Sequence, residues 1–149
     1  MTRSPRVAAL VAGVAATSAP AFARYASIVV DSDTGQVLHA VNADTRNYPA
    51  SLTKMMTLYL VFEALEKGTL KLDQRLTVSK RAAGMPPSKL GLNAGNSIAV
   101  EDAILALTTK SANDAAVVVA EALGGSEIEF AKMMTKRAGE LGMSRTTFR

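Results

Sequence analysis

Cysteine and tryptophan are absent from the 149-residue sequence, and histidine occurs once, as His39. The lack of cysteine excludes disulfides, cysteine nucleophiles and cysteine-ligated zinc. One histidine is too few for a histidine-based metal site, and a Ser-His-Asp triad would have to use that residue. We expect His39 in a strand and not in catalysis. The sequence therefore predicts no metal and no other cofactor.

Aromatic residues and excess charge of one sign are also scarce. Aromatic side chains make up 5% of the residues, and the formal net charge is +4, from 17 basic and 13 acidic residues. The basic residues form no run, so nucleic acid is not an expected partner. Hydrophobic residues make up 48%, which is typical of a globular chain. The length suits one domain or a piece of one.

The N-terminal segment is predicted to be a secretory signal peptide. Arg3 and Arg6 precede an apolar stretch at residues 7–16, and an Ala-Phe-Ala sequence that ends at Ala23 resembles a cleavage site. A membrane-spanning helix is the alternative, but it needs about 20 apolar residues. The stretch before the site is shorter and is interrupted by glycine and proline. We therefore expect cleavage after Ala23 and export from the cytoplasm.

The pattern of hydrophobic and turn residues predicts strands followed by helices, the order typical of the α+β class. Two short β-branched stretches flank a Gly-containing linker, which favours an antiparallel hairpin. The first helix carries no charge over residues 55–62, so we expect it to be surrounded on all sides in the centre of a domain. Residues 70–97 are expected to be loops with at most short strands. The predicted elements are strands at residues 25–30 and 36–41, and helices at 49–67, 101–108, 113–123 and 126–141.

Ser51-Leu52-Thr53-Lys54 is the first candidate for chemistry. At the start of a helix, residues i and i+3 share a face, so the Ser51 hydroxyl and the Lys54 amine can meet. Serine is a weak nucleophile until a base takes its proton. Lysine can be that base if burial lowers its pKa, and the apolar run that follows favours such burial. The simpler alternative is that Ser51 caps the helix and Lys54 is solvated.

Ser111-Ala112-Asn113 is the second candidate, in the turn between two predicted helices. A hydroxyl and a carboxamide that faced Ser51 and Lys54 could relay a proton and hold both the lysine and a substrate carbonyl. The alternative is purely structural, because Ser111-x-x-Asp114 is a capping-box pattern.

Together the two motifs resemble those of the serine-type D-alanyl-D-alanine carboxypeptidases, the low-molecular-mass penicillin-binding proteins of peptidase family S11. The resemblance runs from about Tyr25 to the last residue. Its most specific stretches are residues 48–57 (YPASLTKMMT) and 111–116 (SANDAA). It implies an α+β fold of the β-lactamase/transpeptidase type, in which an antiparallel sheet packs against a helical cluster.

The resemblance also implies roles for the candidate residues. Ser51 would be the acylated nucleophile, and Lys54 would be its general base. Ser111 would take part in proton transfer to the leaving D-alanine, and Asn113 would position Lys54 and the substrate. The substrate would be the D-Ala-D-Ala end of a peptidoglycan pentapeptide, and β-lactam antibiotics would acylate the same serine.

One motif of the resembled family is missing. No lysine is followed by Thr-Gly, and Lys67-Gly68-Thr69 has the wrong order. Residues 24–149 would then be the N-terminal part of the catalytic domain, truncated before the late strands and inactive alone. Any membrane contact would come from a C-terminal anchor outside this sequence. Two alternatives stay open: a class A-type β-lactamase, although Ala112 stands where that class has Asp, and a catalytically incomplete fragment of the same fold.

Overall fold

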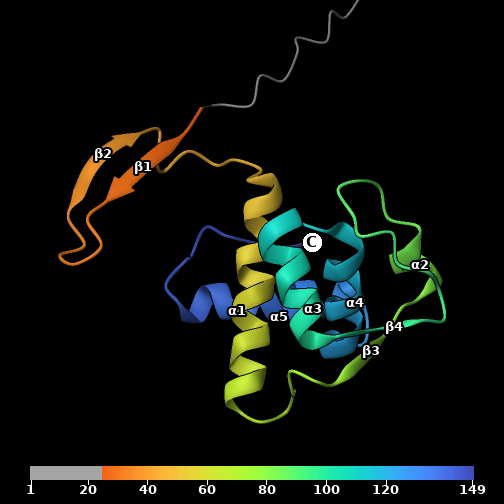
Figure 1. Cartoon of the computed structure of the whole chain (residues 1–149). Helices are drawn as coiled ribbons and strands as arrows, with labels where there is room; N and C mark the ends of the chain where they lie inside the picture. The colour runs from red at the N-terminus through yellow and green to blue at the C-terminus, as the bar shows by residue number, and fades with distance from the viewer. Residues whose placement is uncertain (1–24) are drawn as a thin grey trace, which may run out of the picture. The chain divides into compact units, whose positions relative to one another are not determined.

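The computed structural model describes residues 25–149, and the chain divides into two units after Asn47. Unit 1 contains β1 (Ser27–Val30) and β2 (Val37–Val41), and the described helices all belong to unit 2, residues 48–149 (Figure 1). The predicted signal peptide and its cleavage site lie outside the described residues. Within residues 25–149, no helix is both long and apolar enough to cross a membrane.

Strands β1 and β2 form the predicted antiparallel hairpin, with His39 of β2 opposite Val29 of β1. The Asp31 carboxylate organises the connection, because its Oδ1 accepts hydrogen bonds from the Thr34 backbone N–H (2.8 Å) and hydroxyl (2.6 Å). Gly35 follows with a φ of 72°, a left-handed conformation that glycine adopts without strain. Thr34 and Gly35 belong to the linker that indicated a turn in the sequence, whereas Asp31 was not singled out there.

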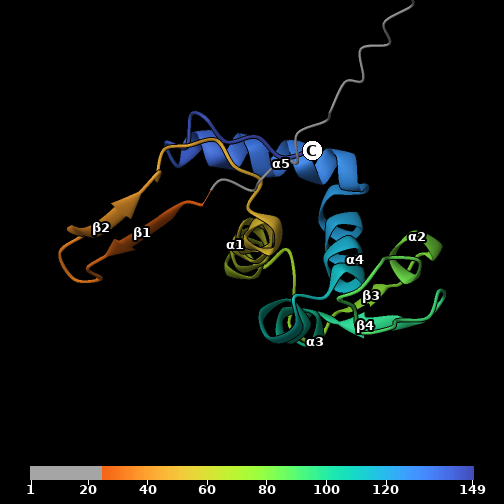
Figure 2. The same cartoon turned by 90° about the horizontal axis from the view of Figure 1, so that it is seen from above.

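Unit 2 is a helical cluster with one small antiparallel β-sheet, β3 paired with β4. Its elements in chain order are a 3₁₀ turn (Ala50–Leu52), α1 (Thr53–Glu66), β3 (Arg75–Thr77), α2 (Lys80–Ala83), β4 (Ser97–Ala99), α3 (Val100–Leu105), a π-turn (Ala106–Lys110), α4 (Asn113–Gly124) and α5 (Glu127–Glu140). Figure 2, which looks along α1, shows α5, α4 and α3 around three of its sides. The predicted α+β class is confirmed, and so are the helices expected at α1, α4 and α5.

The core of unit 2 is formed around α4 by buried residues of α1, α5, α3, α2 and the β3–β4 sheet. Val61 of α1 is 0% exposed, and Val118 and Val119 of α4 are 1% exposed. Phe130 of α5 belongs to the same buried cluster. Full burial of such a side chain stabilises a fold by about 1.5–3 kcal/mol. This packing fixes where the first turns of α1 and α4 lie.

The expectation that α1 is surrounded on all sides is only partly met. Its buried side chains include Leu60, Val61 and Ala64. On another side, Met55 is 66% and Phe62 is 52% exposed. When nearly every position of a helix is apolar, the sequence contains no period that tells which face is covered. Within the described residues, α1 therefore presents an apolar face to solvent.

The segment between α1 and α3 contains the short strands that the sequence allowed, as β3 and β4, but the one-turn helix α2 was not predicted. Ser79 caps it, since its hydroxyl accepts a hydrogen bond from the Ala82 N–H at 2.9 Å. The helix expected at residues 101–108 begins at Val100 and continues from α3 into the π-turn. The cap predicted for α5 is present, because the Ser126 hydroxyl accepts a bond from the Glu129 N–H at 3.2 Å.

The close approach of Gly124, at the end of α4, to Phe130 of α5 can be tested by substitution. A Cβ at Gly124 would lie 2.6 Å from the backbone nitrogen of Phe130, closer than side chains tolerate. We expect Gly124→Ala to destabilise the chain by about 1–3 kcal/mol. Gly139 of α5 has nothing within 4 Å of its Cβ position, so Gly139→Ala is the matched control. It should stabilise by roughly 0.5–1 kcal/mol. Urea unfolding of both variants checks this, and equal effects would contradict the packing described.

Candidate active site

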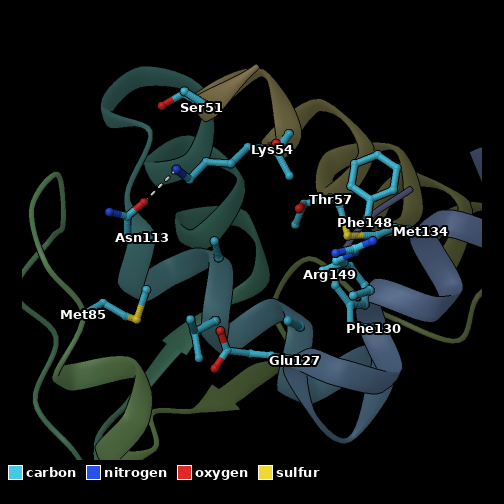
Figure 3. A pocket seen from close by; sticks show the side chains of 16 residues that line it. Ser51, Lys54, Thr57, Met85, Asn113, Glu127, Phe130, Met134, Phe148 and Arg149 are labelled. Carbon is cyan, nitrogen blue, oxygen red and sulfur yellow. Dashed lines mark hydrogen bonds between the residues drawn. The ribbon is translucent and has the colours of Figure 1, made fainter. Parts of the chain in front are cut away.

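Ser51 and Lys54 lie where the chain enters α1. Ser51 is an exposed residue of the 3₁₀ turn, and Lys54 is a half-buried residue in the first turn of α1. Their side chains extend to the same side of the helix start (Figure 3). Ala50, just before the serine, has a φ of 47°, a left-handed conformation that residues other than glycine seldom adopt. Ser51 does not cap α1, because the N-cap position is Leu52 and it has no side-chain bond.

Lys54 contacts the second motif directly. Its Nζ donates a hydrogen bond of 2.8 Å to Oδ1 of Asn113, the first residue of α4. The Asn113 side chain is itself held, because its Nδ2 donates a 3.0 Å bond to the Pro86 carbonyl oxygen. That second bond fixes the amide with its oxygen toward the lysine. Asn113 therefore contacts Lys54, and the roles that the sequence predicted for the two residues stay predictions.

The environment of Lys54 disfavours its charged form. Partial burial removes water from the ammonium group, and this desolvation lowers the pKa of Lys54. The lysine lies beside the buried Thr57 and across from Met85 in one pocket. A lower pKa raises the fraction of neutral amine at a given pH, and neutral amine is the form that can accept a proton.

The pocket has a volume of about 440 Å³ and lies within unit 2. Ser51, Lys54 and Asn113 line one part of it, and apolar residues of α4 and α5 together with the charged Glu127 and Arg149 line most of the rest (Figure 3). These further lining residues include Ala116, Val117, Ala120, Phe130, Ala131 and Met134. The pocket thus combines a hydroxyl, an amine and a carboxamide with an apolar wall, as small-molecule sites commonly do.

Ser111 is placed differently from the other three candidates. It lies two residues before Asn113, at the end of the π-turn, with a φ of 53°, and it is not among the residues that line the pocket. Within the described chain its buried hydroxyl has no hydrogen-bond partner. The alternative that Ser111 caps α4 is wrong, because the N-cap is Ala112 and no side chain caps this helix. A buried hydroxyl without a partner costs about 1–3 kcal/mol, which a purely structural serine does not explain.

Sequence reasoning missed Asp114, which it treated as a first-turn acid. The side chain is 0% exposed, and its carboxylate accepts hydrogen bonds from the backbone of Leu90, Gly91 and Leu92. The one available signal was its neighbourhood, since Asp114 begins a run of apolar residues that continues to position 120. In residues 25–149, no three or more His, Asp and Glu side chains are grouped as metal ligands would be.

A serine, a desolvated lysine and a carboxamide that meet in one pocket are the elements of a serine acyl-transfer site. The family model described as D-alanyl-D-alanine carboxypeptidase (peptidase S11) matches residues 13–149. The chain therefore belongs to this family, as the motifs predicted.

Similar proteins are consistent with that membership. The D-alanyl-D-alanine carboxypeptidase DacF of Bacillus subtilis is 40% identical over 133 residues, which cover 89% of this chain and 34% of that protein. A crystal structure of the carboxypeptidase DacD from Francisella tularensis matches with a TM-score of 0.80 at 35% identity, over 83% of this chain and 30% of that one. Penicillin-binding protein D2 from Listeria monocytogenes, in its ampicillin-bound form, matches with a TM-score of 0.66 at 35% identity, over 83% and 49% of the two chains.

These matches confirm the transpeptidase-like fold that the sequence implied. They also show how much of the relatives is represented, because the chain spans about a third of the length of the curated relatives it matches.

Replacing the carboxamide by a carboxylate tests the electrostatics of the site. In Asn113→Asp, the side-chain oxygen that accepts the 2.8 Å hydrogen bond from Lys54 Nζ becomes part of a negatively charged carboxylate. An opposite charge at that distance favours the ammonium form, so the pKa of Lys54 should rise. Titration of the chain with ¹³C-labelled lysine, followed by NMR, measures it. Asn93→Asp, in an exposed loop, is the matched control and should leave the Lys54 titration unchanged. An unchanged Lys54 pKa in Asn113→Asp would contradict the contact.

Proposed function

We propose that this chain supplies the N-terminal part, residues 24–149, of the catalytic domain of a serine-type D-Ala-D-Ala carboxypeptidase. The enzyme would remove the terminal D-alanine from peptidoglycan stem peptides. The observation that carries the proposal is the 2.8 Å bond from Lys54 to Asn113 in the pocket that Ser51 also lines. The bond joins the two motifs that the family resemblance singles out, across 59 positions of sequence.

In the proposed acylation step, the neutral amine of Lys54 takes the proton of the Ser51 hydroxyl. The Ser51 oxygen attacks the carbonyl carbon of the penultimate D-alanine, and the peptide C–N bond then breaks. The leaving amine of the terminal D-alanine receives the proton from the Lys54 ammonium, by way of the Ser111 hydroxyl. Ser51 is left as an ester of the stem peptide.

In the proposed deacylation step, Lys54 acts as base a second time. It takes a proton from water, the resulting hydroxide attacks the ester carbonyl, and the Ser51 oxygen leaves and regains a proton. The lowered pKa of Lys54 favours the neutral amine that both steps need. The start of α1 adds partial positive charge next to the oxyanion, and the Ser51 backbone N–H is one proposed oxyanion donor.

Asn113 would keep Lys54 directed toward Ser51, and its NH₂ group would donate a hydrogen bond to a substrate carbonyl. We further propose that β-lactam antibiotics acylate Ser51, since penicillin-binding protein D2 from Listeria monocytogenes was crystallised with ampicillin bound. Export to the periplasm, led by the N-terminal signal peptide, would bring the enzyme to its peptidoglycan substrate.

The missing Lys-Thr-Gly motif bears on activity. Lys67-Gly68-Thr69 does not replace it, because Lys67 follows the last turn of α1, at the opposite end of the helix from Lys54. In the family resemblance, that motif lines the site and binds the terminal carboxylate of the substrate. We propose that a longer protein provides it and that residues 24–149 alone have an incomplete site.

Covalent labelling tests the two central residues in the complete enzyme. Ser51→Ala and Lys54→Ala should each abolish labelling by a fluorescent penicillin, because one change removes the nucleophile and the other removes its base. Ser32→Ala, in the exposed hairpin loop, and Lys132→Ala, on the exposed side of α5, are the matched controls and should label as the wild type does. Normal labelling of either site variant would show that the acyl-enzyme assignment is wrong.

Turnover by the isolated segment tests the proposed incompleteness. Purified residues 24–149 should release no D-alanine from a diacyl-D-Ala-D-Ala peptide, whereas the complete enzyme should do so. A single oxyanion donor contributes about 2.7–4 kcal/mol of transition-state stabilisation. An enzyme that lacks the Lys-Thr-Gly segment lining its site should therefore lose most of its turnover rate. An amino-acid oxidase assay for free D-alanine measures the difference. Comparable turnover by the two would mean that the site needs no third motif.

A further inference from the structure

Asp114 is a fully buried carboxylate that takes no part in the proposed chemistry. Its Oδ1 accepts hydrogen bonds from the N–H groups of Leu90 and Ala115, both at 3.0 Å. Its Oδ2 accepts from Gly91 at 2.8 Å and from Leu92 at 3.0 Å. Each oxygen therefore has two donors. Three of these donors belong to a segment more than twenty positions away in sequence, so the carboxylate fixes a loop and not its own helix.

The same loop is attached to the residues just before Asp114. The Asn113 backbone N–H donates to the Ser88 carbonyl at 2.7 Å, and the Ser88 hydroxyl donates to the Lys110 carbonyl at 2.8 Å. We define the positioned loop as residues 85–92. Met85, the first residue of this loop, lines the same pocket as Lys54 and Asn113 (Figure 3).

Pro86 of the positioned loop controls the orientation of the Asn113 amide. Its carbonyl oxygen accepts the 3.0 Å bond from Asn113 Nδ2. An asparagine side chain has a donor end and an acceptor end of nearly the same shape, and neighbouring groups decide which way it faces. If the Pro86 carbonyl moved away, only the contact with Lys54 would orient the amide, and the neutral amine of Lys54, which can accept as well as donate, would no longer select the oxygen end.

We propose that Asp114 is a positioning residue: it holds the positioned loop so that the Pro86 carbonyl keeps the Asn113 amide oxygen directed at Lys54. The inference rests on the proposed function, because it concerns how the same site is kept in its working arrangement. The Asp114 carboxylate accepts its hydrogen bonds from backbone N–H groups of residues 90–92 and 115, so it acts on the site through the loop and Asn113.

The ionised state of Asp114 strengthens its hold on the positioned loop. Burial by itself raises the pKa of a carboxyl group, but the hydrogen bonds from Leu92, Leu90 and Gly91 outweigh that effect, and the pKa of Asp114 is lowered. The carboxylate is thus ionised in the neutral range, and its bonds to the loop are charge-assisted, which makes them stronger than bonds between neutral groups.

The test compares Asp114→Asn with the wild-type chain by NMR. Asparagine keeps the shape but replaces one oxygen by NH₂, which cannot accept from the backbone donors that face it. Amide hydrogen exchange in residues 90–92 should accelerate by about tenfold or more. The side-chain NH₂ resonances of Asn113 and the Lys54 Cε resonance should shift with it. Exchange in α5 should stay unchanged, which shows that the fold is kept. Asp73→Asn, the same change at an exposed site, should alter none of these signals.

Two NMR results would overturn the proposal. One is unchanged exchange in residues 90–92 of Asp114→Asn. The other is faster exchange with unmoved Asn113 and Lys54 signals, which would show that the loop does not orient the amide. If Asp114→Asn does not fold, measurements on the wild-type chain test the proposal. Through-hydrogen-bond coupling between the Gly91 nitrogen and the Asp114 carboxylate, together with a restrained Asn113 NH₂ group, is expected, and freely rotating Asn113 signals would refute the inference.

Covalent labelling separates this inference from the proposed function. In the complete enzyme, Asp114→Asn should slow acylation by a fluorescent penicillin about tenfold or more, since a misplaced base loses rate steeply. Asp114→Glu keeps the charge and should recover part of that rate. Wild-type rates in Asp114→Asn would overturn the inference and leave the function intact. A wild-type enzyme that never labels would instead overturn the function, and the NMR measurements would still decide the role of Asp114.

Discussion

The packing of α1 against α4 is the constraint on which the site depends. Both helices bury apolar residues in one core, around Val61 and Val118, and this brings their first turns together. Lys54 and Asn113 then meet at 2.8 Å although they are far apart in sequence. Because each helix start carries partial positive charge, two of them at one pocket favour a developing anion and disfavour an ammonium. The core thus sets both the geometry and the electrostatics of the pocket.

Much of this arrangement could be predicted from sequence because local patterns encode it. The turn residues between the strands, the long apolar helix and the Ser126 cap each match an element that formed. The Ser51–Lys54 spacing placed both side chains at one helix start. Which face of α1 is covered could not be predicted, because a helix that is apolar all round gives no period. The bond from Lys54 to Asn113 was expected only through family resemblance, since no local rule brings residues 54 and 113 together.

Asp114 shows the limit of local rules most clearly. Ser111-x-x-Asp114 has the spacing of a capping box, yet neither side chain caps α4. The backbone N–H groups of Leu90, Gly91 and Leu92 bind the Asp114 carboxylate instead, and hydrogen bonds to an ionised acceptor are stronger than bonds between neutral groups. These bonds depend on tertiary contacts. The pattern in the sequence is the same whether the acid caps its own helix or holds another segment.

Backbone strain is concentrated where the chemistry is proposed. Within unit 2, the residues other than glycine with positive φ are Ala50, directly before Ser51, and Ser111, two positions before Asn113. Conformations of this kind cost about 1–3 kcal/mol each and persist only where surrounding structure imposes them. The same region holds a desolvated lysine and a buried hydroxyl without a partner, and neither stabilises the fold. The core around α4 offsets these costs. Single substitutions could remove each of these costs, so their joint presence near the Ser51–Lys54 and Ser111–Asn113 motifs supports the catalytic role proposed above.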